Sequence, residues 1–172
     1  MPITLLLLFS QVCDPRRGQG KMYPLAPILL FTVLAMLAGA MSYRQVHAFI
    51  RTHLDRLNST FGVFLRKAPA YTTLRFILQG LDGSCVRRES HAQFYERPEV
   101  QFLRPTHHKL HYTRDVIFQE DQSRIRHNPG VVARLRSFGY NILRHNKVST
   151  FSQDRYAAAL VGLDTLLKWK YC

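Results

Sequence analysis

The chain has 172 residues and carries 24 Lys and Arg against 11 Asp and Glu, which gives a formal net charge of +13 at pH 7. Hydrophobic residues make up 47% of the sequence, and the three cysteines, Cys13, Cys85 and Cys172, lie far apart. This composition excludes a disordered tail and a disulfide scaffold, and the charge favours a polyanionic partner such as nucleic acid or an acidic membrane surface.

Residues 1–13 form an apolar leader. No basic residue precedes its apolar run, Thr4 to Phe9, so this run is not expected to be a signal peptide. The cysteines have no CxxC spacing, which gives no thiolate metal site and makes a reducing cytoplasm the expected compartment.

A longer apolar stretch covers residues 22–43. It contains no charged residue, and a stretch of this length can span a bilayer. Pro24 and Pro27 break its first third, however, and leave an uninterrupted helix of about 13 to 16 residues where a span needs about 20. We therefore expect a buried core helix over about 27–39, apolar on all faces. The alternative is a single-span membrane protein that uses residues 28–43.

Two amphipathic helices are predicted next. Ser42 is a suitable N-cap for the first, Pro69 precedes the second, and residues 58–67 between them are predicted to form a loop. Apolar residues recur at steps of three and four, which places them on one face of each helix. The predicted buried residues are Val46, Phe49, Ile50, Leu54 and Leu57 in the first helix and Tyr71, Leu74, Ile77, Leu78 and Leu81 in the second.

The pattern fails over residues 83–109, which we interpret as a junction. After it, DVIF at 115–118 is predicted to be a short strand or a helix start, and residues 153–169 are predicted to form a last helix. Between these two segments another helix is predicted, and Asn128 and Pro129 are suitable residues to begin it. Its predicted buried stripe is Val131, Val132, Leu135, Phe138, Ile142 and Leu143.

One group of residues invites a metal hypothesis, because imidazole and carboxylate together suit zinc or manganese. The group consists of His107, His108, His111, Asp115, Glu120 and Asp121. Its spacing matches no closed metal site and HExxH is absent, so we assign no metal ligand. GxSxG, a Walker loop and GxGxxG are absent too, which disfavours a hydrolase.

Three segments resemble one family, the H-repeat-associated transposases of bacterial insertion sequences. DPRRGQGKMYPLAPILLFTVLAMLAGAMSYRQVHAFI at 14–50 is similar to the start of that family's amino-terminal domain, and PAYTTLRFILQGLD at 69–82 resembles a later helix of the same domain. LHYTRDVIFQEDQSRIRHNPGVVARLRSFGYNIL at 110–143 resembles its carboxy-terminal signature. The segments occur in family order, which makes the resemblance specific.

The resemblance implies a DDE transposase, in which two Asp and one Glu of a ribonuclease-H-like core hold two Mg²⁺ ions for phosphodiester chemistry. That core would have to lie in residues 83–109, which are too few to build it. LDGSCVRR at 81–88 only faintly echoes the first Asp motif, and His107 stands where the family has its Glu. We therefore expect an internally deleted, inactive protein with no catalytic residue and no cofactor, whereas intact members use Mg²⁺.

The expected fold is mainly α: a three-helix amino-terminal domain (14–82) and a helical carboxy-terminal remnant (110–172) of a ribonuclease-H-like transposase, with little or no sheet. The expected function is nonspecific, nucleoid-associated DNA binding, because guanidinium groups suit phosphate. The expected DNA-binding residues are Arg16, Arg17, Lys21, Arg44, Arg51, Arg75, Arg124, Arg126, Arg134 and Arg136. Two alternatives stay open: a helical bundle whose arginines are only solvated, and a small protein that binds or inhibits an intact transposase.

Overall fold

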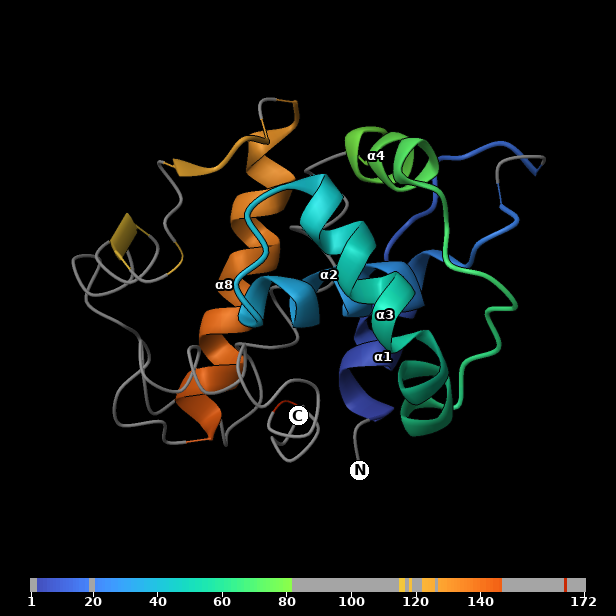
Figure 1. Cartoon of the computed structure of the whole chain (residues 1–172), viewed down its shortest axis with the longest axis horizontal. Helices are drawn as coiled ribbons and strands as arrows, with labels where there is room; N and C mark the ends of the chain where they lie inside the picture. Colours follow the sequence, from blue (N-terminus) through green and yellow to red (C-terminus); the bar gives the residue numbers. More distant parts are fainter. Residues whose placement is uncertain are drawn as a thin grey trace.

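The computed structural model of the chain describes residues 3–18, 21–81, 115, 116, 118, 122–125, 127–146 and 166. These residues contain five α-helices and no strand, so the expectation of a mainly helical fold is confirmed (Figure 1). The helices are α1 (Ile3–Ser10), α2 (Leu25–Leu37), α3 (Tyr43–Phe61), α4 (Tyr71–Gln79) and α8 (Pro129–His145).

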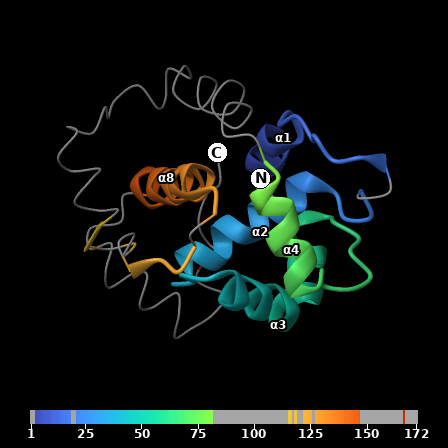
Figure 2. The same cartoon turned by 90° about the horizontal axis from the view of Figure 1, so that it is seen from above.

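Helix α2 is the centre of the core. It contacts α1, α3 and α8, and Figures 1 and 2 show it between α8 on one side and α1 and α3 on the others. All of its residues except Ala26 are buried, as an apolar helix without a polar face requires. The hydroxyl of its polar residue, Thr32, donates to the carbonyl oxygen of Ile28 at 2.6 Å and is thereby satisfied.

The prediction of a buried core helix in this stretch is confirmed, although α2 begins two residues before Pro27. Pro27 is tolerated there because the first N–H groups of a helix have no intrahelical acceptor. Helix α2 has 13 residues, and no helix in the described part of the chain is both long and apolar enough to cross a membrane.

Helix α1 places the apolar leader inside the folded body. Leu5, Leu8 and Phe9 are buried, and the Phe9 ring packs edge to face against Phe138 of α8 with ring centroids 5.3 Å apart. The leader is therefore part of the core.

Helices α3 and α4 follow the predicted apolar stripes. Ser42 caps α3, its side chain accepting from the Gln45 N–H at 3.3 Å, as predicted. The prediction of a loop from residue 58 is wrong by one turn, since α3 continues to Phe61 and ends at Gly62 in the left-handed conformation (φ 63°). Asn58 explains the difference, because its backbone stays helical while its side chain donates to the carbonyl oxygen of Leu65 and accepts from the N–H of Leu65.

Helix α8 starts at Pro129, and every residue of its predicted stripe is buried. Asn128 acts differently from a cap: its φ is 52°, and its side-chain amide donates to the carbonyl oxygens of Gln79 (3.4 Å) and Leu81 (2.5 Å) at the end of α4. Helix α8 approaches α2 closely at Gly139, where an added Cβ would lie 3.3 Å from the Leu37 side chain. The predicted helix over 153–169 lies outside the described residues except for Leu166, which is helical and buried. In DVIF, Asp115, Val116 and Phe118 are described; they form no strand, and Phe118 is buried.

Candidate nucleic-acid interface

The predicted DNA-binding residues divide into exposed and buried groups. Those exposed to solvent are Arg17, Lys21, Arg44, Arg51, Arg75 and Arg124. Arg134 is half-buried, and Arg126 lies outside the described residues. Arg16 and Arg136 are buried and need a different interpretation.

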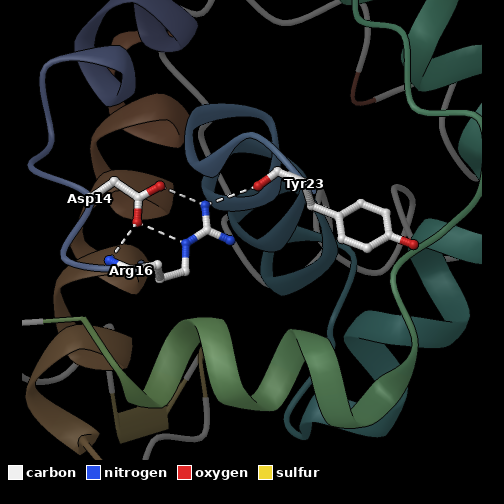
Figure 3. A network of polar contacts seen from close by, with 3 residues as sticks. All are labelled: Asp14, Arg16 and Tyr23. Atoms are coloured by element: carbon white, nitrogen blue, oxygen red, sulfur yellow. Dashed lines mark hydrogen bonds and ion pairs between the residues drawn. The ribbon is translucent and has the colours of Figure 1, made fainter. Parts of the chain in front are cut away.

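Arg16 holds the turn between α1 and α2 together. Its Nε and Nη2 donate to Oδ1 and Oδ2 of Asp14, each at 2.7 Å, and Nη2 also donates to the Tyr23 carbonyl at 2.9 Å (Figure 3). Only 4% of the Arg16 side chain is exposed. These hydrogen bonds from Arg16 hold the pKa of Asp14 below its usual value. The expectation that Arg16 faces DNA is therefore wrong, because its guanidinium group makes its hydrogen bonds inside the protein.

Arg136 also makes its hydrogen bond inside the protein. It is 2% exposed, and its Nη2 donates to Ser123 Oγ at 2.8 Å. Ser123 Oγ in turn donates to the Met41 carbonyl at 3.5 Å and accepts from the Ile125 N–H. Arg136 thus connects α8 to the start of α3 and does not reach the surface, contrary to its predicted role.

The same region brings three distant segments of the chain together. Tyr43 of α3 donates its hydroxyl to the His127 carbonyl at 3.3 Å, and Asn128 bonds the end of α4. The first turn of α3, the end of α4 and residues 122–125, 127 and 128 therefore meet in one region. Each contributes an exposed arginine, and we call Arg44, Arg75 and Arg124 together the junction surface.

Two tyrosines interact with two arginines of the junction surface. The guanidinium carbon of Arg44 lies 5.7 Å from the centre of the Tyr71 ring, within the range of a cation–π contact. Burial raises the pKa of Tyr43, and the positive charge of Arg75 partly opposes this increase. Arg44 thus lies over Tyr71, and the charge of Arg75 acts on Tyr43.

Negative charge is scarce around the junction surface. Asp55 is the single acidic residue between positions 21 and 81, and no ion pair of Arg44, Arg75 or Arg124 occurs within the described residues. Their charges are therefore available to a phosphate backbone, to which guanidinium groups bind well.

The acids in the described ranges do not fit a two-metal site. They are Asp14, which is paired with Arg16, and Asp55 and Asp115, which are exposed. Nowhere in these ranges do three His, Cys, Asp or Glu side chains gather in a way that could hold a metal ion. The histidine-rich group around His107 and the acids Asp82, Glu120 and Asp121 lie outside the described residues.

Sequence reasoning missed two exposed aromatic rings. Phe76 of α4 is 68% exposed and Phe64, after α3, is 94% exposed. A signal for Phe76 exists in the sequence, since it falls outside the apolar stripe of its helix.

Comparison with known proteins places most of the helices in one family. The model of the family described as DDE_Tnp_1-associated matches residues 6–90, which contain α1 from Leu6 onward and the whole of α2, α3 and α4. The chain is 34% identical over 68 residues to the protein named inactive transposase YbfQ of Escherichia coli (strain K12), a match covering 39% of this chain and 80% of that relative. No solved structure matches.

Proposed function

The chain belongs to the DDE_Tnp_1-associated family, and from this premise we propose that it binds DNA nonspecifically and does not catalyse strand transfer. It is a transposase-family remnant, and the similar protein of Escherichia coli is itself named an inactive transposase. The proposed setting is the nucleoid.

The junction surface carries the DNA-binding part of this proposal. Its three exposed arginines come from separate segments of the chain, and hydrogen bonds hold those segments against each other. Phosphate contacts of this kind give affinity without sequence information, so the proposed binding is nonspecific. Arg17, Lys21 and Arg51 add to the positive surface elsewhere.

The salt dependence of binding tests the proposal. Each phosphate contact contributes about 0.9 to the slope of log affinity against log salt for duplex DNA. We expect Arg44→Gln and Arg75→Gln each to reduce that slope by about 0.9, measured by fluorescence anisotropy.

The matched control is Arg56→Gln. Arg56 is exposed on the same helix, twelve positions after Arg44, which corresponds to about 18 Å along the axis. This exceeds the Debye length of about 8 Å at physiological salt, so the control should leave the slope nearly unchanged. Absence of binding at low salt, or equal effects of all three variants, would contradict the proposed interface.

The lost catalysis belongs to the same proposal, and its support is the length of the chain, because residues 83–109 are too few to build a ribonuclease-H-like core. We expect no cleavage of DNA when Mg²⁺ is added. Cleavage that requires Mg²⁺ and disappears in Asp115→Ala would disprove this part.

The alternative is a partner for an intact transposase that binds through its apolar helix or its carboxy-terminal helices, and the structure gives less support to the first of these surfaces. The apolar helix is α2, and it is already covered by α1, α3 and α8 of its own chain. The DNA-binding proposal needs only side chains that are exposed.

A further inference from the structure

Phe76 is an exposed aromatic ring held on the outside of α4. Its neighbours Leu74, Ile77 and Leu78 are all buried, which fixes the helix with Phe76 facing outward and leaves the ring 68% exposed. Thr72, one turn earlier, is exposed on the same face, and Arg75 is exposed about 100° round the helix axis from Phe76. The ring therefore stands on the outer side of a packed helix and cannot turn into the core.

The surroundings of this ring are cationic. Arg75 precedes it in the sequence and is exposed on the same outer half of the helix, and Arg44 lies over Tyr71 at the start of that helix. No Asp or Glu occurs between residues 56 and 81. A ring among arginines, without acids or other exposed apolar residues of its helix, differs from the apolar centre of a protein–protein interface, where charge is depleted.

We infer that Phe76 stacks on an unpaired nucleobase of single-stranded DNA while Arg75 and Arg44 contact the adjoining phosphates. This inference rests on the proposed DNA binding and names the form of DNA that the junction surface prefers. Proteins that hold single strands combine cationic surface with exposed aromatic side chains, because every base has a face on which a ring can stack. In a duplex the bases are stacked on each other, and the ring of Phe76 would have no base face to contact.

Phe64 provides a matched control for the ring. It is 94% exposed because its neighbours Val63 and Leu65 are buried in the segment that follows α3. It lies beyond the carboxyl end of α3, whereas Arg44 lies in the first turn, and the 19 residues of α3 separate these ends by about 28 Å. Phe64 is thus more exposed than Phe76 but lies at the end of α3 that is far from Arg44.

The experiment compares an oligonucleotide as a single strand and as a duplex, at equal salt, by fluorescence anisotropy. We expect the protein to prefer the single strand and Phe76→Leu to weaken that complex about tenfold, which is about 1.4 kcal/mol and within the range of base–aromatic stacking. Duplex affinity should change little. Phe76→Trp, which keeps a ring, should retain the preference, and Phe64→Leu should match the unaltered protein.

Three results would overturn the inference: Phe76→Leu lowering both affinities equally, Phe76→Leu changing neither, or Phe64→Leu having the same effect. If the arginine variants still lower affinity in those cases, only the stacking role fails and the proposed DNA binding stands. If the protein binds neither form of DNA at low salt, both fail. Circular dichroism of the Phe76 variants checks that they fold, which their surface position leads us to expect.

Discussion

Arg16 and Arg17 are adjacent arginines with opposite roles. Arg16 uses its planar fork on both oxygens of Asp14 and on a backbone carbonyl, while Arg17 is exposed. We expect Arg16→Ala to lower the free energy of unfolding by about 2 kcal/mol, because it leaves the partly buried Asp14 carboxylate and Tyr23 carbonyl without this donor. Arg17→Ala should change it by less than about 0.5 kcal/mol. Urea denaturation of both variants decides this, and similar losses would contradict the assignment.

The Asp14 carboxylate makes part of this stability depend on pH. Its pKa is lowered by the Arg16 hydrogen bonds, so its contribution is complete above the ordinary Asp value of about 3.9 and is lost as the pH falls through the lowered value. We therefore expect the difference in unfolding free energy between the native protein and Asp14→Asn to shrink in acid. A difference that stays constant from neutral pH to acid would show that the ion pair does not stabilise the turn.

The sequence alone could not separate Arg16 from Arg17, because the distinction depends on a turn that brings the Tyr23 carbonyl within reach. Arg136 was more predictable. It lies four residues after Val132 and three before Gly139, both buried, so helical spacing already places it on the inner side of α8. The exposure of Arg44, Arg51 and Arg75 follows directly from the apolar stripes of their helices.

Helices α3, α4 and α8 were predictable because each has one apolar face and a polar one, which gives a clear period. Helix α2 has no such period and was found from its length and its prolines. The eight residues of α1 are too few and too uniformly apolar to show a pattern, and only their packing against α2 identifies them as a core helix.

The packing of α8 on α2 depends on the absence of a side chain at Gly139. A Cβ there would lie 3.3 Å from Leu37 Cδ2 and 3.4 Å from two ring carbons of Phe118. We expect Gly139→Leu to destabilise the protein by about 1–3 kcal/mol through overpacking. Gly130→Ala is the control, since an added Cβ there meets nothing within 4 Å. Thermal unfolding with equal midpoints for both variants would argue against close packing at Gly139.

The two ends of the described chain form one body, which the sequence did not predict. Periodicity tells which face of a helix is buried but not which distant helix covers it, and the segments that meet here are about 80 residues apart in the sequence, as with Tyr43 and His127. The junction surface follows from this long-range packing, so Arg44, Arg75 and Arg124 could be proposed separately but not as neighbours.

This arrangement predicts that the amino-terminal helices need the rest of the chain. Removing everything after residue 81 would take away α8 and uncover apolar surface on α2 and on Phe9, which packs against Phe138. We expect the fragment to bind a hydrophobic dye and to lose cooperative unfolding, because a buried apolar helix would face water. Dye fluorescence and calorimetry measure these two effects, and size-exclusion chromatography shows whether the fragment is monomeric. A monomeric fragment with the unfolding midpoint of the whole chain would show instead that the family domain is complete in itself and that α8 is only an addition to its surface.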